Sequence, residues 1–546
     1  MNGTPVPLTR QWWQHPWWQY PCLRTALCGL AAALPALVAY LPTVAPTISW
    51  RNGGADSGDL AAAVMTLGIP HPPGYPTYVL LGWLWTALPL GGDVAYRLNV
   101  LSAVSAAVAA GLGAAGVAAL GARAGFWPAA VAGGAVAGGL VFGLAPLTWS
   151  QATITEVYAP GLAVLGALGL LLLSGATATR PGARIAAGLL GGLGLGVLPQ
   201  LALVGPGALV LLVSQAGWRR APAALAQATG GGIVGLCAFA MLPWRAAADP
   251  LANWGDPSTP ARFWALVSAE SYQHIVGSTG LMQWGGRVVE SALLLGDSLG
   301  WLWLLLAVVG SGTLATRQRA ALVYLLCLTA LTVAFRAAYP ADGNEVYLLP
   351  ALYGLALLAG LGATRLLTEL HLRSGRLLPG LAAAGLFGLL LGRAILTAPA
   401  LDVSADNAAD AFGRRIMRDL PAQALVVSDY DETTFALWYR QAAGDRPDVV
   451  VVDGRLLTRD WYRAQLVRRH PDLNAAAVRP GGLTALARPV YTLIGPPTEA
   501  TLKLGRHAPA GRALVVTSHQ PQQVAAGGAG RVPAALDLTY QKEDAS

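Results

Sequence analysis

The chain alternates long apolar runs with short polar connections along most of its length. A helix that crosses a bilayer needs about 20 predominantly apolar residues, and eleven segments meet or approach that length. The predicted spans are residues 25–45, 96–120, 127–147, 157–176, 184–199, 201–215, 224–243, 289–311, 320–336, 346–366 and 377–396. A further apolar segment, 78–89, is too short to cross and predicts an interfacial or re-entrant helix. The pattern predicts an α-helical polytopic membrane protein.

Charged residues alternate between the connections. Arginines in cytoplasmic connections set the orientation of a membrane protein. One set of connections carries Arg123, Arg180, Arg184, Arg219, Arg220, Arg317, Arg319, Arg365, Arg373 and Arg376. The other set carries acids, namely Asp56, Asp59, Glu156, Asp256, Asp342 and Glu345. We therefore predict a multi-pass protein of the cytoplasmic (inner) membrane, with its N-terminus in the cytoplasm and its acidic loops outside.

The predicted domains follow from this orientation. Residues 1–24 form a cytoplasmic segment, and 25–396 form the transmembrane domain, with a first outer loop at 46–95 and a long outer loop at 245–288. From 397 to 546 the pattern changes to short β-branched runs and helical stretches, as in ALVVSDYDETTFALWYRQAAGDRPDVVVVDG, PVYTLI and ALVVTS. This predicts a soluble α/β domain. An odd number of spans places it outside, and it has no glycine-rich phosphate-binding loop.

Composition supports the membrane assignment and excludes some functions. Charged residues are 12% of the chain, about half of the roughly 25% that is usual for globular domains. The net charge of +8 comes mainly from scattered arginines without a basic stripe, so we predict contacts with membrane lipids and no nucleic-acid binding. The four cysteines show neither metal-ligand spacing nor a disulfide framework.

The first outer loop carries the strongest candidate site, in GGADSGDLAAAVMTLGIPHPPGYPTYVLLG (53–82). In a structural interpretation, Asp56 is the N-cap of a helix and Asp59 stabilises its first turn. In a functional one, a carboxylate fixed at the membrane surface is a general base. The stiff HPPGYP turn then holds His71 and Tyr75 beside the acids. The local pattern leaves both interpretations open.

Other outer loops add polar and aromatic residues to this face. They are Glu156, Tyr158, Arg245, Arg336, Glu345 and Tyr347. Transfer of a sugar from a lipid-phosphate donor requires a base for the acceptor hydroxyl and a cation for the departing phosphate. Arg245 and Arg336 are candidates for that cation because guanidinium matches phosphate geometry; the alternative is ordinary snorkelling at the interface.

The two acids of the first outer loop are also candidate metal ligands. Carboxylates bind hard cations through oxygen, so Asp56 and Asp59 together are candidate ligands. Two carboxylates without further clustered acids make a poor site, however. We predict no cofactor and no metal, with a divalent metal left open for experiment.

Several segments resemble a known family. The stretch GADSGDLAAAVMTLGIPHPPGYPTYVLLG is similar to the first outer loop of membrane protein O-mannosyltransferases of the GT-C superfamily. Further segments resemble the same family in the same order, between about residues 45 and 470: WSQATITEVYA, LPWRAAADPLANWGDPSTPARFW, NEVYLLPALYGLALLAGLG and TTFALWYRQAAGDRPDVVVVDGRLLTRDWY.

The resemblance implies a fold, a reaction and roles for residues. The fold is GT-C, and the reaction is an inverting transfer of mannose, or a related sugar, from a polyprenyl-phosphate donor to Ser/Thr hydroxyls of extracytoplasmic proteins. Asp56 is the implied general base, and Asp59 assists it or positions the acceptor. His71 and Tyr75 line the site, with Glu156 and Tyr158 contributed by the second outer loop.

Three alternatives stay open at the level of sequence. The first keeps the donor but transfers the sugar to a glycan or a lipid. The second is a transporter or flippase of lipid-linked sugars, which predicts inverted repeats with broken helices at the bilayer midplane. The third is a membrane scaffold whose soluble domain binds a partner, which predicts no dependence on Asp56.

Overall fold

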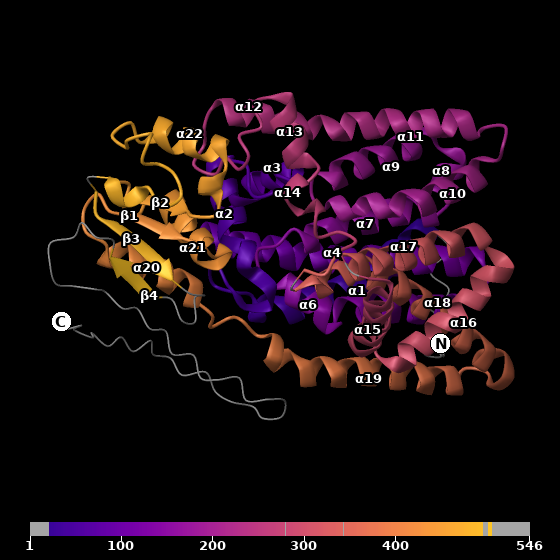
Figure 1. Ribbon diagram of the computed structural model, residues 1–546. Helices are drawn as coiled ribbons and strands as arrows, with labels where there is room; N and C mark the ends of the chain where they lie inside the picture. The colour runs from indigo at the N-terminus through magenta and orange to yellow at the C-terminus, as the bar shows by residue number, and fades with distance from the viewer. Residues whose placement is uncertain (1–20, 279, 342, 487, 495–500, 505–546) are drawn as a thin grey trace, which may run out of the picture.

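Long helices lie side by side in a bundle, and a small α/β domain sits at one end of it (Figure 1). The computed structural model describes residues 21–494, except 279, 342 and 487, together with 501–504. Asp342 and the predicted strand ALVVTS (513–518) therefore lie outside the described residues. The apolar runs form the bundle, and the acidic loops meet the α/β domain.

The helices of the bundle and its loops follow the apolar pattern closely. In chain order they are α1 (Pro21–Tyr40), α2 (Ser57–Thr66), α3 (Pro76–Thr86), α4 (Val94–Arg123), α5 (Pro128–Gly143), α6 (Pro146–Ala152), α7 (Tyr158–Leu173), α8 (Ala176–Thr179), α9 (Pro181–Leu195), α10 (Gly205–Ala216), α11 (Ala221–Leu236), α12 (Met241–Ala247), α13 (Pro260–Val267), α14 (Glu270–Gln273), α15 (Leu281–Leu299), α16 (Trp301–Arg317), α17 (Arg319–Ala338), α18 (Leu349–Ser374) and α19 (Leu377–Leu401).

Within the described residues, seven helices are long and apolar enough to cross a membrane, or up to nine if each bent pair is one span. The predicted count of eleven is not confirmed. The predicted span 289–311 needs correction, because α15 and α16 meet there at an angle of 103°. Gly300, between them, has φ +95°, a conformation that glycine adopts readily and other residues rarely. A single glycine therefore divides what the hydropathy pattern presents as one run.

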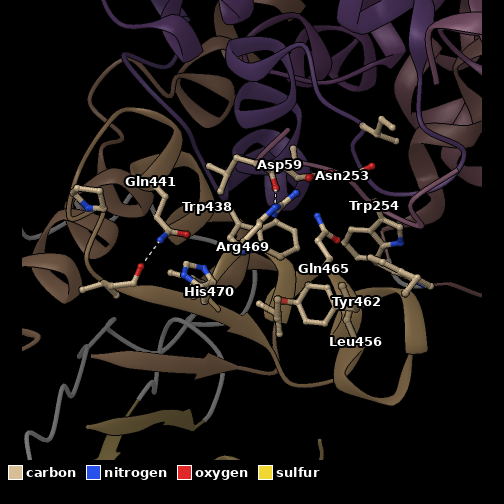
Figure 2. Close-up of a pocket in the computed structure, with 18 residues that line it drawn as sticks. Asp59, Asn253, Trp254, Trp438, Gln441, Leu456, Tyr462, Gln465, Arg469 and His470 are labelled. Atoms are coloured by element: carbon tan, nitrogen blue, oxygen red, sulfur yellow. Dashed lines mark hydrogen bonds between the residues drawn. The ribbon is translucent and has the colours of Figure 1, made fainter. Parts of the chain in front are cut away.

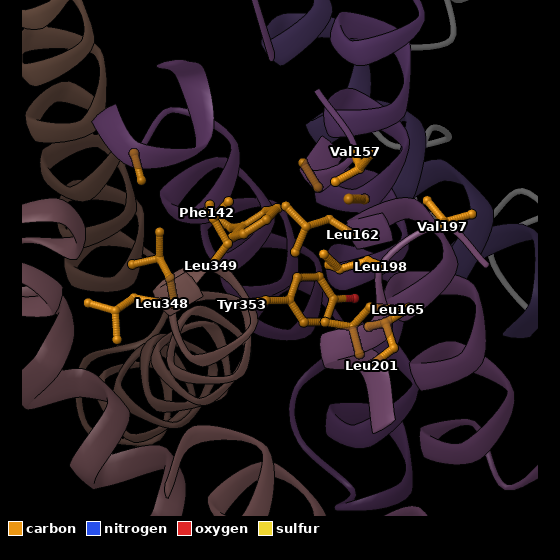
Figure 3. Packing of buried hydrophobic residues seen from close by; sticks show 14 of the residues in the cluster. Phe142, Val157, Leu162, Leu165, Val197, Leu198, Leu201, Leu348, Leu349 and Tyr353 are labelled. Carbon is orange, nitrogen blue, oxygen red and sulfur yellow. The ribbon is translucent and has the colours of Figure 1, made fainter. Parts of the chain in front are cut away.

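Two helices form the buried centre of the bundle. In the apolar segments of α4 and α18, 78% and 83% of the residues are buried, whereas in that of α19 only 17% are buried, so α19 lies at the periphery. Small residues allow helix backbones to approach closely in membrane proteins; a Cβ on Gly138 of α5 would lie 2.9 Å from the Cα of Gly360 in α18. Larger side chains fill the remaining space, and Phe142 meets Tyr353 edge-on at 5.1 Å (Figure 3).

The C-terminal domain confirms the predicted α/β class. Its elements are α20 (Ala408–Asp419), β1 (Leu425–Ser428), α21 (Asp431–Ala442), β2 (Val450–Asp453), α22 (Asp460–Arg469), β3 (Val490–Ile494) and β4 (Thr501–Leu504). The strand order is β2-β1-β3-β4, in which β1 is parallel to β2 and β3 while β4 is antiparallel to β3. Residues of α20 and α21 pack on one set of strand side chains, and residues of α22 pack on the other set. Helices therefore cover both faces of the sheet.

The α/β domain is fixed tightly to the outer loops. Helix α2 packs against α21 so closely that a Cβ on Gly58 would lie 2.4 Å from the carbonyl oxygen of Phe435. The Trp50 indole Nε1 donates a hydrogen bond of 3.1 Å to the carbonyl of Glu432. On the other side of the contact, Asp249 of the long loop accepts hydrogen bonds from α22. These contacts hold the domain against the loop that carries Asp56.

We expect Gly58→Ala to loosen this contact. The added methyl group meets the backbone of Phe435 and Ala436, and overpacking of this kind costs about 1–3 kcal/mol. The Tm should fall by several degrees, and limited proteolysis should release the C-terminal domain more readily. Gly182→Ala is the matched control, because a Cβ at that helical glycine has nothing within 4 Å. An unchanged Tm and unchanged protease resistance in Gly58→Ala would contradict the close packing.

Candidate active site

His71 lies between two carboxylates. Its Nδ1 is 2.8 Å from Oδ2 of Asp59, and its backbone N–H donates to the same oxygen at 2.8 Å. Its Nε2 is 3.5 Å from Oδ2 of Asp56. The Asp59 side chain is 1% exposed, whereas that of Asp56 is 38% exposed. Asp59 therefore orients the imidazole from behind, and Asp56 presents its carboxylate toward solvent.

The first turn of α2 does not use its acids as caps. Asp56 occupies the N-cap position, but its side chain makes no capping hydrogen bond to the described residues. Ser57 instead donates to the carbonyls of Gly54 and Ser49, at 2.5 and 2.9 Å. Asp59 lies in the first turn, yet its Oδ2 accepts from His71. The capping interpretation thus describes the position of these acids but not their interactions.

The turn that carries His71 is fastened to the long outer loop. Ile69 donates its N–H to the carbonyl of Ala252 at 2.7 Å, and Trp254 donates back to Ile69 at 3.0 Å. Arg245 donates to the carbonyls of Leu67 and Thr66, at 2.7 and 3.1 Å, where α2 ends. Three hydrogen-bonding contacts from a distant segment therefore fix the position of the turn.

Aromatic rings enclose the imidazole. Phe435 stacks on His71 with ring centroids 6.2 Å apart, while Tyr75 and Trp254 meet it edge-on at 5.2 and 6.4 Å. Tyr75 was predicted from the sequence, but Phe435 and Trp254 were missed. Both missed residues lie in segments that resemble the family, FALWY and LANWG. That resemblance was the available signal, although it assigned these rings no role.

The charge of His71 follows from its neighbours. Burial favours the neutral ring, but the charges of Asp56 and Asp59 and the hydrogen bond to Asp59 outweigh burial and raise the pKa of His71 from 6.5 to about 10. The imidazolium is therefore the form expected at neutral pH. It holds a positive charge between the two carboxylates.

The carboxylates near His71 have raised pKa values. Burial is the largest cause for Asp56; His71 lowers its pKa, while Asp431, Asp59 and Glu432 raise it further. Glu156 is buried, and burial followed by the charge of Asp56 holds its pKa well above the usual range for glutamate. A raised pKa makes Asp56 a stronger base than an exposed aspartate. It also favours the protonated form of Glu156, in which the carboxyl group can donate a hydrogen bond.

The stability of the protein should depend on His71 in a pH-dependent way. A histidine whose pKa rises on folding contributes stability that is fully present below its unfolded-state pKa, here 6.5, and is lost as the pH rises through about 10. We expect His71→Gln to lower the Tm strongly near pH 6, by a contribution on the order of a few kcal/mol, and much less near pH 10. His274→Gln changes an exposed histidine of the long loop and serves as the control. A Tm difference that is independent of pH would contradict the imidazolium between two carboxylates.

The structure brings three of the six other predicted residues to the same place. Tyr158 meets Tyr347 edge-on at 6.1 Å, and Tyr347 in turn meets Tyr339 at 5.6 Å. Glu156, two residues before Tyr158 in sequence, interacts electrostatically with both Asp56 and His71. Together they form an acidic and aromatic cluster around Asp56.

Three predicted residues lie apart from this cluster. Arg245 is engaged at the end of α2, as described above, and its guanidinium lies over Trp244. Arg336 is 2% exposed and binds both oxygens of Glu290, at 2.9 and 3.0 Å. Glu345 is exposed to solvent.

A cavity of about 260 Å³ lies behind Asp59, between the long loop and the C-terminal domain. Figure 2 shows Trp438 and Arg469 of the domain beside Asp59 and Asn253. The Oδ1 atoms of Asp59 and Asn253 are buried without a hydrogen-bond partner among the described residues. Among those same residues, no group of three or more His, Cys, Asp or Glu is placed to hold a metal ion.

The bundle of apolar helices, its outer loops and the C-terminal domain have the fold of a known membrane enzyme. Two structures of ArnT from Cupriavidus metallidurans, one in the apo state and one bound to undecaprenyl phosphate, superpose with TM-scores of 0.52 and 0.50. Each is 15% identical in sequence and covers 79% of this chain and 90% of that chain. The chain therefore has an ArnT-like fold, in agreement with the GT-C fold that the sequence predicted.

Sequence comparisons show which known proteins the chain is similar to. Residues 56–221 match the N-terminal domain of the protein O-mannosyl-transferase TMEM260, and 409–479 match TMEM260-associated domain 2. The mouse protein O-mannosyl-transferase TMEM260 is 29% identical over 457 residues, which make up 77% of this chain and 62% of that protein. The chain thus spans less than two thirds of the length of this relative. These matches are to proteins of the kind that the resemblance in the sequence indicated, the protein O-mannosyltransferases.

Proposed function

We propose that this protein is a membrane glycosyltransferase that transfers a sugar, most simply mannose, from a polyprenyl-phosphate donor to Ser/Thr hydroxyls of extracytoplasmic proteins. The observation that carries the proposal is the Asp56 carboxylate. It is accessible, has a raised pKa, and is positioned by the buried His71–Asp59 pair. It also stands at the start of the segment that matches the family's N-terminal domain.

The geometry supports an inverting displacement. Asp56 accepts the proton of the acceptor hydroxyl while that oxygen forms a bond to the anomeric carbon of the sugar. The bond between the anomeric carbon and the phosphate oxygen breaks, and the phosphate leaves with the electron pair. His71, as an imidazolium, keeps Asp56 in place and offsets its charge, and protonated Glu156 is positioned to donate a hydrogen bond to the substrate.

The departing phosphate requires a cation, and we assign this role to Arg287, because the guanidinium of Arg336 is occupied by both oxygens of Glu290. Arg287 donates to the carbonyl of Tyr339 at 3.4 Å, and its Nε is buried without a partner among the described residues. Arg336 binds the carbonyl of Arg287 at 3.3 Å. Tyr339 lies in the tyrosine chain that leads through Tyr347 to Tyr158. The guanidinium of Arg245, in contrast, is engaged by backbone carbonyls.

The proposed orientation places the site outside the cytoplasmic membrane. Basic connections face the cytoplasm by the positive-inside rule, so the acidic cluster and the C-terminal domain face the opposite side. No metal or cofactor is assigned to the reaction, and we expect a chelator to leave the rate unchanged. Loss of activity that magnesium or manganese restores would overturn this part of the proposal.

Reconstitution tests the proposal. The purified protein in liposomes is given polyprenyl-phosphate-mannose together with a Ser/Thr peptide, an oligosaccharide or a lipid acceptor, and the products are analysed by mass spectrometry. We expect one hexose on the peptide and none on a matched peptide with Ser and Thr changed to Ala. Transfer to the oligosaccharide or to the lipid, and not to the peptide, would show that the acceptor is not a protein. Movement of the donor across the bilayer without transfer would favour a flippase, a class in which broken helices such as the α15–α16 pair are common.

A further inference from the structure

A second, larger cavity lies beside the candidate active site. Its volume is about 820 Å³, and it separates the long outer loop from the C-terminal domain. One wall consists of residues between Trp254 and His274, and the other consists of residues between Asp431 and Trp461. This volume falls within the range of roughly 300–1,000 Å³ that is typical of ligand-binding pockets. We call it the interdomain cleft.

The sheet places the interdomain cleft where α/β domains bind ligands. The chain leaves β1 toward α21 on one face and leaves β2 toward α22 on the other face. Because β1 and β2 are parallel, both end at the same edge of the sheet, and α/β domains bind ligands outside the carboxyl ends of their strands. Asp431 follows β1 and Arg455 follows β2, and the two side chains form an ion pair across this edge. Both residues line the cleft.

The interdomain cleft lies close to the proposed base. Pro72, the residue after His71, forms part of its lining. Asp431 and Tyr272 also line it. Both side chains interact electrostatically with the Asp56 carboxylate. Burial is the largest cause of the raised pKa of Tyr272, and the charge of Asp56 raises that pKa further. A molecule in the cleft therefore lies next to the carboxylate that is to receive a proton.

The lining indicates how a ligand reaches the interdomain cleft. Among the described residues, none of those that line the cleft belongs to a candidate membrane span. A ligand therefore enters from the aqueous side rather than from the bilayer. This access suits a water-borne acceptor and does not suit a lipid.

The chemistry of the lining favours a polypeptide. Three arginines face three acids, namely Arg262, Arg455, Arg459, Glu270, Asp431 and Asp460. Because the charges balance, the cleft selects neither a polyanion nor a polycation. Trp254, Tyr272 and Trp461 add flat apolar surface between these polar groups. Mixed aromatic and polar walls of this kind bind extended peptides through side-chain packing and backbone hydrogen bonds.

We propose that the interdomain cleft is the acceptor site, in which an extended, hydroxyl-bearing segment of a polypeptide lies across the carboxyl edge of the sheet with its Ser or Thr at Asp56. This inference rests on the proposed function, because it assigns the acceptor of that same reaction. It also gives the C-terminal domain a direct part in substrate binding.

Photo-crosslinking tests occupancy of the cleft without requiring turnover. Arg459→p-benzoylphenylalanine places the probe on an exposed position of the cleft, and Arg418→p-benzoylphenylalanine is the control on exposed α20, which packs with α21 on the other face of the sheet. The full-length protein also carries Asp56→Asn and is irradiated with a biotinylated Ser/Thr peptide. We expect the peptide to crosslink at 459 and not at 418. Equal labelling at both positions, no labelling, or labelling by a lipid or oligosaccharide probe instead of the peptide would overturn the inference.

A kinetic experiment separates failure of this inference from failure of the proposed function. Ser271→Trp fills the cleft from an exposed position, and Ser404→Trp makes the same change at an exposed position outside it. We expect Ser271→Trp to raise the acceptor KM at least 10-fold and to leave the donor KM within 2-fold, while Ser404→Trp changes neither. If transfer occurs but Ser271→Trp leaves the acceptor KM unchanged, the cleft is not the acceptor site although the proposed function stands. Crosslinking at 459 without any sugar transfer would support binding of a peptide in the cleft but would refute the proposed function.

Discussion

Asp56→Asn should lower the rate of sugar transfer by about 10²- to 10⁴-fold, the range that a positioned general base contributes. The amide retains the size of the carboxyl group but cannot accept the acceptor's proton at neutral pH. Donor binding, measured as the donor Kd, should remain because Asp56 acts on the acceptor hydroxyl. The loss should therefore fall mainly on kcat.

Glu432→Gln is the matched control for this prediction. Glu432 is a nearby acid whose charge acts on Asp56, but its side chain has no recorded contact with His71 among the described residues. We expect this variant to keep a rate within a few-fold of the wild type. Transfer by Asp56→Asn at a rate similar to that of the control would remove Asp56 from the role of base.

Asp59→Asn should have the second largest effect, a loss of roughly 100-fold or more, as occurs when the carboxylate that orients a catalytic histidine becomes an amide. The asparagine oxygen still accepts hydrogen bonds from His71, so the turn should keep its shape. The charge that stabilises the imidazolium is lost, however, and the pKa of His71 should fall. At neutral pH a smaller fraction of His71 is then protonated, and it offsets the charge of Asp56 less fully.

The pH profile distinguishes this positioning role from simple structural damage. Lowering the pH restores the imidazolium, so the rate of Asp59→Asn relative to wild type should rise as the pH falls toward about 6. Asp59→Glu restores the charge and should recover most of the activity. A loss that is the same at every pH, or that Asp59→Glu does not relieve, would contradict the proposed role of Asp59.

The sequence predicted the bundle well where the physical signal is local. A run of about 20 apolar residues forms a helix in any bilayer because its backbone must satisfy its own hydrogen bonds, and α1, α4, α17, α18 and α19 lie where such runs predict them. The break between α15 and α16 was not predictable. Gly300 is one of 66 glycines, and its positive φ depends on packing rather than on its neighbours in sequence.

In the candidate site, too, the sequence predicted the residues that are close in sequence and missed those that only tertiary packing brings there. Asp56, Asp59, His71 and Tyr75 lie within 20 residues of one another, so a short helix and a stiff turn suffice to bring them together. Phe435 reaches His71 only because α21 packs on α2, a contact that no local pattern encodes.

The electrostatic partners of the predicted arginines could not be predicted from the sequence either. The pairing of Arg336 with Glu290 was hidden because Glu290 lies at the start of a predicted apolar span, where an acid is not expected to find a partner. Arg287, which the sequence did not single out, lies beside Arg336 for the same tertiary reason. Long-range contacts of this kind depend on how distant helices pack.

The stereochemistry of the product tests the central claim most directly. Wild-type protein in liposomes is incubated with polyprenyl-phosphate-mannose of known anomeric configuration and a Ser/Thr peptide, and the glycopeptide is examined by NMR. The mechanism with Asp56 as base predicts a single mannose on a Ser or Thr side-chain oxygen, with the anomeric configuration inverted relative to the donor. A product with retained configuration, or no glycopeptide from an active donor and folded protein, would contradict it.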